Sequence, residues 1–132
     1  MVFAVAAGND NRDACDYSPA AAEQAITVGA STLYDTRAYF SNYGKCVDVF
    51  APGLNIQSVW KGSKYATNTI SGTSMASPHV AGLAAYFLSM SENGSSPKEI
   101  KDKILEMASK DKLSTVPNDT PNLLIYNGGE WI

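Results

Sequence analysis

The stretch from residue 69 to residue 82 constrains the fold of this chain more than any other. It runs from a β-rich segment through Gly72 into a long apolar segment, which predicts a strand, a glycine turn and a helix with Ser74 in its first turn. The first backbone N–H groups of a helix lack partners within it, and the helix dipole adds positive charge there. Ser74 could therefore be a helix cap, or a nucleophile whose oxyanion meets donors already in place.

The composition allows a packed core and argues against two classes of partner. The 132 residues are one domain's worth of material or less, and 45% of them are hydrophobic. A net charge of −3 argues against a nucleic-acid partner. The longest apolar run, residues 80–88, is far shorter than the ~20 residues that cross a membrane. Residues 1–7 have neither the basic start nor the cleavage pattern of a secretion signal.

Apolar and β-branched runs predict several strands before this helix. Residues 1–7 and 25–30 are typical of strands buried on both faces of a sheet, and residues 46–51 predict a third strand. Residues 56–60 and 65–70, separated by a four-residue turn, predict a hairpin that leads to Gly72. A globular protein seldom starts with its most buried strand, so we expect this chain to be part of a longer polypeptide.

Two helices are predicted in the second half of the chain. The helix that contains Ser74 is apolar on nearly all sides, which predicts burial within a core. A second helix is predicted to begin at Ser96, because Pro97 and Glu99 complete a capping pattern and apolar residues then recur at helical spacing. The lysines between residues 98 and 112 indicate one solvated face of this helix.

Two motifs carry a resemblance to a known protein family. The string Gly72-Thr73-Ser74-Met75-Ala76-Ser77-Pro78-His79-Val80-Ala81-Gly82 resembles the active-serine signature of the subtilisin-like serine proteases, whose nucleophile is the serine after Gly-Thr. Ala6-Ala7-Gly8-Asn9 is similar to the segment whose asparagine side chain donates to the oxyanion. The resemblance also implies that the backbone of Ala6, Ala7 and Gly8 forms one wall of the primary specificity pocket. By itself, Asn9 would be interpreted as a turn residue that tolerates left-handed geometry.

The resemblance covers essentially the whole chain. Residues 9–51 resemble the proteinase K branch of the family, and residues 119–129 resemble the fungal vacuolar members of the cerevisin type, some relatives of which are known as allergens. The implied fold is α/β: the C-terminal part of a three-layer fold with a parallel sheet, in which Ser74 begins the central buried helix.

The resemblance further implies that residues 1–132 are the C-terminal portion of a single peptidase domain. In this family the catalytic Asp and His precede the serine, and no segment like those that carry them occurs in this chain. His79, the only histidine, lies five residues beyond Ser74 on the same predicted helix. We expect it to be a structural histidine tied to the core rather than the base. The expected partner is the N-terminal portion of the same domain.

The implied function is a serine endopeptidase that forms an acyl-enzyme on Ser74. Its substrates would be peptides or proteins, with broad specificity and an apolar residue before the scissile bond, and its chemistry requires no cofactor. The alternative is a catalytically inert fragment that acts only as a binding or antigenic piece, such as a fungal allergen.

A disulfide and a calcium site are also implied by the resemblance. Cys15 and Cys46 look like the paired cysteines of some relatives, although two free thiols would be expected in a reducing compartment. Asp48, with the backbone carbonyls of Glu23 and Ala25, corresponds to a calcium site of proteinase K. The alternative is that Asp48 is a solvated residue of an edge strand.

Asn93 and Asn118 each begin an N-x-S/T sequence in a predicted loop, so both are candidate glycosylation sites. Together with the predicted disulfide they favour passage through the secretory route, to a vacuole or to the exterior.

Overall fold

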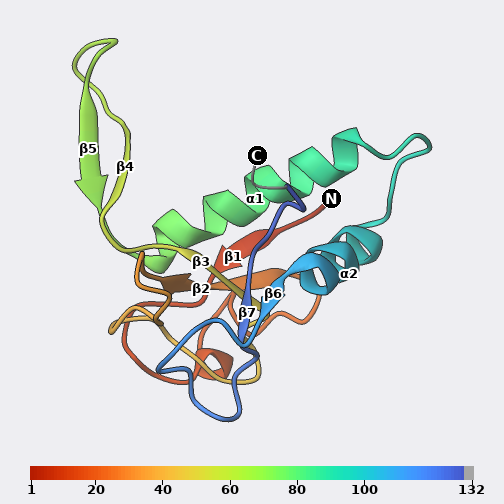
Figure 1. The fold of residues 1–132 in the computed structure, drawn as a ribbon, viewed down its shortest axis with the longest axis horizontal. Helices are drawn as coiled ribbons and strands as arrows, with labels where there is room; N and C mark the ends of the chain where they lie inside the picture. The colour runs from red at the N-terminus through yellow and green to blue at the C-terminus, as the bar shows by residue number, and fades with distance from the viewer. Residues whose placement is uncertain (130–132) are drawn as a thin grey trace.

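The computed structural model describes residues 1–129, which form an α/β fold around one five-stranded sheet. The first four strands in spatial order run parallel, and the fifth is antiparallel to its neighbour. In that order they are β1 (Ala4–Ala6), β2 (Ile26–Ser31), β3 (Val49–Pro52), β7 (Leu123–Leu124) and β6 (Ser109–Lys110). Figure 1 shows α1 (Thr73–Ser89) lying across one face of this sheet, with α2 (Pro97–Met107) beside it.

The main core lies between the sheet and the two helices. All six residues of β2 are buried, and Ile26, Val28 and Ala30 alternate onto the face that α1 covers. The opposite face packs a smaller cluster that includes Phe50. A Cβ at Gly29 would lie 2.5 Å from the Phe50 ring, so β2 requires a glycine at that position for the ring to pack.

The predicted strands are present, but the bounds of some strands and the burial of β1 differ from the prediction. β2 matches the predicted strand at 25–30 within one residue, whereas β3 begins three residues later than expected. The prediction that residues 1–7 are buried on both faces is wrong: β1 spans three half-buried residues, and only Ala7 just after it is fully buried. Among residues 1–129 the reason is that β1 lies at the edge of the sheet, with β2 as its single neighbour.

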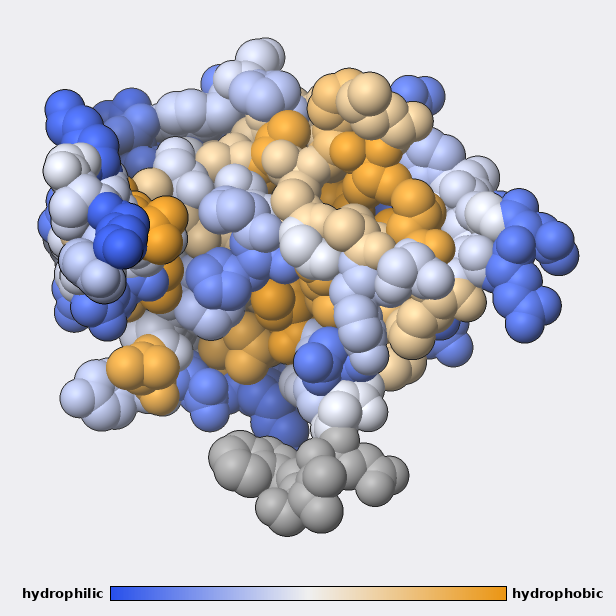
Figure 2. Space-filling view, turned by 90° about the horizontal axis from the view of Figure 1, so that it is seen from above, coloured by the Kyte–Doolittle hydropathy of each residue, from blue (hydrophilic) through white to orange (hydrophobic). Residues whose placement is uncertain are grey.

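Helix α1 also differs from its prediction. Its buried residues face the sheet, but Tyr86 and Leu88 are 48% and 44% exposed, and Met90 just after the helix is 52% exposed. Figure 2, which looks down on this side of the molecule, shows hydrophobic residues gathered on the surface. These side chains remain exposed within residues 1–129, so the helix is buried on one side rather than all round. No helix in this part of the chain is long and apolar enough to cross a bilayer.

The predicted hairpin and the second helix are confirmed. β4 (Ile56–Val59) and β5 (Thr67–Ile70) pair antiparallel and project away from the sheet (Figure 1), joined by residues 60–66 rather than by four residues. α2 begins with a complete capping box between Ser96 and Glu99, and Pro97 is its first residue. A short 3₁₀ helix, η1 (Ala14–Asp16), follows the turn after β1.

Candidate active site

Ser74 is the second residue of α1 and is exposed, in the first turn as predicted. The turn before it depends on Gly72, whose φ of 155° lies in the region that favours glycine. The Gly72 N–H donates to the carbonyl of Gly53 at 2.8 Å, and the Gly72 carbonyl accepts from Met75 at 3.0 Å. The backbone N–H of Ser74 belongs to the first turn of the helix and therefore has no acceptor within it.

Asn9 approaches this turn from the far end of the sequence. Its Oδ1 accepts two hydrogen bonds from Thr73, one from the backbone N–H at 2.9 Å and one from the hydroxyl at 2.8 Å. Gly72, at the N-cap position, provides no side-chain cap, so Asn9 caps α1 from a distant segment. With its oxygen held by Thr73, the amide can present only its nitrogen to other groups.

The two predicted oxyanion donors lie around one point. A Cβ built on Gly72 would be 3.6 Å from the backbone nitrogen of Ser74 and 3.7 Å from Nδ2 of Asn9. Sδ of Met75 is nearest to this position at 3.5 Å, and a glycine at residue 72 keeps a side chain out of it. The arrangement can therefore stabilise negative charge that develops beside Ser74 Oγ.

Two residues that the sequence analysis missed hold the Asn9 loop. The hydroxyl of Thr73 accepts from the Gly8 N–H at 3.1 Å. Asn42 is fully buried, and its Oδ1 accepts from the backbone N–H groups of Asp10 at 3.1 Å and Arg12 at 2.9 Å. Its Nδ2 donates to the carbonyl of Ala7 at 2.9 Å. Sequence spacing gives no sign of this role, because Asn42 is more than 30 residues from the loop that it supports.

Residues Ala6, Ala7 and Gly8 run from the end of β1 into Asn9, next to the start of α1. Gly8 has a φ of 106°, and a Cβ there would meet Nδ2 of Asn42 at 2.3 Å. The chain can therefore turn from β1 into Asn9 only with glycine at this position. That these three residues line a specificity pocket stays a prediction.

A groove of about 450 Å³ lies beside Ser74. One side is formed by Ser74, Met75 and His79 of α1, and the other by the β4–β5 hairpin, including Ile56 and Trp60. The hairpin thus provides a wall of mixed polar and apolar residues next to the candidate nucleophile.

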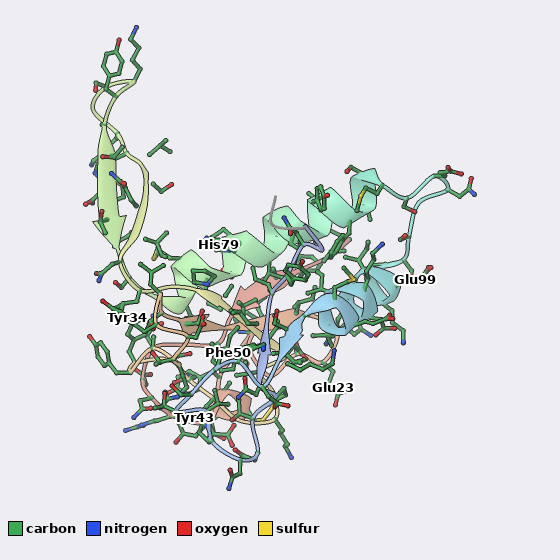
Figure 3. The ribbon with its side chains drawn as sticks, in the orientation of Figure 1. Glu23, Tyr34, Tyr43, Phe50, His79 and Glu99 are labelled. Carbon is green, nitrogen blue, oxygen red and sulfur yellow. A yellow bond between two sulfur atoms is a disulfide. The ribbon has the colours of Figure 1, made fainter. Side chains whose placement is uncertain are left out.

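His79 is exposed on α1, which corrects the prediction that it is tied to the core. Figure 3 shows His79 on α1, and its Nδ1 donates to the carbonyl of Met75 at 2.8 Å, one turn back on the same helix. His79 lies on the same helix as Ser74, five residues further along, as expected. Its ring is hydrogen-bonded to the backbone of that helix. Within residues 1–129 no hydrogen bond joins His79 to Ser74, so the two are not paired as base and nucleophile.

The predicted disulfide is confirmed. Cys15 and Cys46 are bonded to each other, which ties η1 to the segment before β3. Candidate glycosylation residues Asn93 and Asn118 are both exposed and lie in loops, as predicted. Whether either carries a glycan stays a prediction.

The three predicted calcium ligands come together, but around the side chain of Lys101. Its Nζ donates to the carbonyls of Glu23 and Ala25 and lies 3.4 Å from Oδ1 of Asp48. Burial raises the pKa of the Asp48 carboxyl, an effect that the Thr27 backbone N–H and Lys101 partly offset. With this ammonium in place the site does not fit a calcium ion. Elsewhere among residues 1–129, no group of three or more His, Cys, Asp or Glu residues could hold a metal.

Comparison with known proteins identifies the family. A sequence model described as the Subtilase family matches residues 1–123. The chain belongs to the subtilase family.

Its similar relatives include several fungal proteases. The chain is 66% identical to Subtilisin-like protease 8 of Arthroderma otae, 64% to Subtilisin-like serine protease Pen c 2 of Penicillium citrinum and 65% to Alkaline protease 2 of Aspergillus fumigatus. These alignments cover 98%, 98% and 96% of this subtilase chain, but only 28%, 30% and 27% of the relatives. The chain thus spans less than a third of the length of each of these relatives.

A solved structure shares the fold. A crystal structure of a cold-adapted subtilisin-like serine proteinase superposes with a TM-score of 0.90 at 46% identity, over 98% of this subtilase chain and 46% of that chain. The expected α/β fold with a mostly parallel sheet is therefore confirmed for the region that the chain covers.

Proposed function

We propose that this chain provides the nucleophile and the oxyanion donors of a subtilisin-like serine endopeptidase of the proteinase K branch, similar to fungal vacuolar enzymes of the cerevisin type. The observation that carries the proposal is the double hydrogen bond from Thr73 to Oδ1 of Asn9. It leaves the Asn9 amide nitrogen close to the same point beside Gly72 as the Ser74 N–H. Membership of the subtilase family and the identity to fungal proteases support the same proposal.

In this mechanism the oxygen of the Ser74 hydroxyl attacks the carbonyl carbon of a peptide bond, and a general base takes the hydroxyl proton. The carbonyl oxygen becomes an oxyanion that accepts from the Ser74 N–H and from Nδ2 of Asn9. Collapse of this intermediate expels the amine, which takes the proton, and leaves an ester on Ser74. Water then hydrolyses the ester by the reverse sequence of proton transfers.

The base and its orienting carboxylate are proposed to lie outside these 132 residues. His79 is the only histidine of the chain, and its ring is bonded to Met75 on its own helix. The coverage of less than a third of each fungal relative supports this view. Residues 1–132 would then be the C-terminal portion of one peptidase domain, and the N-terminal portion would be their partner.

Peptide or protein substrates are proposed, with broad specificity and an apolar residue before the scissile bond. The backbone of Ala6, Ala7 and Gly8 would form one wall of the pocket for that residue. The chemistry would need no cofactor.

The protein is proposed to pass through the secretory route to a vacuole or the exterior. The disulfide between Cys15 and Cys46 supports an oxidising compartment. Glycans on Asn93 or Asn118 would be detected as a loss of mass on glycosidase treatment of the natural protein.

Peptide hydrolysis by the intact gene product tests the proposal. We expect Ser74→Ala to abolish turnover, and Asn9→Ala to lower kcat more than it changes KM, because the lost hydrogen bond forms in the transition state. Ser89→Ala, at the far end of α1, is the control and should retain activity. Activity that survives in Ser74→Ala would contradict the proposal, and an inactive unmodified protein would favour the alternative of an antigenic or binding piece.

A further inference from the structure

Lys101 fills a site built from three separate segments of the chain. Its Nζ donates to the carbonyl of Glu23 at 2.8 Å and to the carbonyl of Ala25 at 2.9 Å. Asp48 Oδ1 lies 3.4 Å from the same nitrogen. Figure 3 shows Glu23 next to α2, the helix that carries Lys101. The ammonium therefore links α2 to the segments that lead into β2 and β3.

The surrounding structure holds these oxygens in place. Oδ2 of Asp48 accepts from the backbone N–H of Thr27 at 2.8 Å, while the Asp48 N–H donates to the Thr27 carbonyl at 2.9 Å. The side chains of Lys101 and Asp48 are only 18% and 21% exposed. By contrast, Lys98 on the same helix is 83% exposed and pairs with Asp102 across one helical turn. Lys101 is thus distinguished from Lys98 by the acceptors that its ammonium meets.

With Lys101 in place, the site suits an ammonium and leaves no position for a calcium ion. Calcium binds six to eight oxygens at about 2.3–2.6 Å, whereas the two carbonyls lie at N–H···O distances from Nζ. An ammonium has three donors, and three oxygen-bearing groups surround this one. A divalent cation bound to the same oxygens would be repelled by the positive charge of Lys101 and would have to displace it.

We propose that the Lys101 ammonium is a built-in substitute for the calcium ion that the family resemblance implies at Asp48, Glu23 and Ala25. The clamp between α2 and the starts of β2 and β3 is then independent of calcium, because the cation is part of the chain. This proposal does not depend on the catalytic role of Ser74.

The unmodified protein gives the first test. The melting temperature of the intact gene product is measured with chelator and with excess calcium, and compared with that of Asp48→Asn. We expect calcium to shift both melting temperatures equally, since any calcium response comes from elsewhere in the protein. A calcium response of the unmodified protein that Asp48→Asn removes would overturn the proposal. This measurement decides the question even where a Lys101 variant fails to fold.

Removal of the ammonium gives the second test. In chelator, Lys101→Ala should lower the melting temperature by roughly 3–8 °C, while the matched surface variant Lys98→Ala should change it little. Calcium at roughly millimolar concentration should then restore stability to Lys101→Ala, because the three oxygen-bearing groups are freed. The double variant Lys101→Ala/Asp48→Asn should not be restored. A Lys101→Ala protein that calcium does not stabilise, or that is as stable as Lys98→Ala in chelator, would overturn the proposal.

Discussion

Asn9 and Thr73 lie 64 residues apart in the sequence and are joined by two hydrogen bonds that end on the same oxygen, Oδ1 of Asn9. This contact has two consequences for one side chain. Oδ1 caps the start of α1, which has no cap from Gly72, and the amide nitrogen is left facing the volume beside Ser74. The stability of the helix start and the position of the proposed oxyanion donor therefore depend on each other.

Thr73→Val should lower activity without touching either proposed donor. The variant loses the hydroxyl that donates to Asn9 and accepts from Gly8, so Asn9 is held by the backbone bond alone. The loss of about one hydrogen bond predicts a fall in kcat of roughly 5–10-fold, with KM little changed. Thr73→Ser retains the hydroxyl and is the control. Steady-state kinetics that show equal kcat for the valine and serine variants would refute this role of Thr73.

Gly72→Ala should impair activity beyond its effect on stability. Both Gly72 and Gly62 have positive φ values, 155° and 116°, so alanine is strained at either position. A Cβ at residue 72 would point into the volume between Ser74 N and Asn9 Nδ2, whereas one at residue 62 meets nothing within 4 Å.

Kinetics and thermal unfolding of Gly72→Ala and Gly62→Ala separate the two effects. We expect both variants to lose stability, by roughly 1–2 kcal/mol each, and only Gly72→Ala to lose kcat. If kcat falls equally in both, the volume beside Gly72 has no special role.

Local patterns predicted more of this fold than of its site. The start of α2 was predictable because Ser96, Pro97 and Glu99 act within a few residues of one another. β2 was predictable because a strand covered on both faces is rich in apolar and β-branched residues. The exposure of Tyr86 was not predictable, since a helix with apolar residues on all sides gives no indication of which face packs against the sheet.

The long-range contacts of the site show the same limit. Ser74 and Asn9 were found through motifs, but their connection through Thr73 and the support of the loop by Asn42 exist only after the chain folds. Lys101 was assigned to a solvated face with its neighbouring lysines, because helical spacing cannot reveal two carbonyls on another segment.

Loss of the disulfide should destabilise the protein by roughly 3–4 kcal/mol. The bond between Cys15 and Cys46 closes a loop with a sequence separation of 31, which restricts the unfolded chain. The double variant Cys15→Ser/Cys46→Ser, unfolded in denaturant under oxidising conditions, measures this difference. Equal stability of the double variant and the unmodified protein would show that the bond contributes nothing to the fold.

Because of Glu99, the stability of the protein should decrease as the pH falls through the acid range. The backbone N–H of Ser96, followed by the Ser96 side chain, lowers the pKa of Glu99. A carboxyl with a lowered pKa in the folded state stabilises the protein above its ordinary pKa, and this contribution is lost as the pH falls through the lowered value.

The melting temperature of Glu99→Gln should therefore fall less steeply than that of the unmodified protein as the pH drops through the lowered pKa of Glu99. Glu106→Gln removes one charge from the same helix outside the capping box and is the control. A decline as steep in Glu99→Gln as in Glu106→Gln would argue against a charged capping box at the start of α2.

The most direct test of the central claim is the reaction of a fluorophosphonate probe, followed by mass spectrometry of the labelled peptide. If Ser74 is the nucleophile, we expect a single adduct on Ser74 in the intact gene product, none in Ser74→Ala, and normal labelling in Ser89→Ala. We also expect the isolated 132-residue chain to stay unlabelled, because no hydrogen bond joins its only histidine to Ser74 among the described residues. An adduct on another residue would contradict Ser74 as the nucleophile. Labelling of the isolated chain at the rate of the intact protein would contradict a base that lies outside these 132 residues.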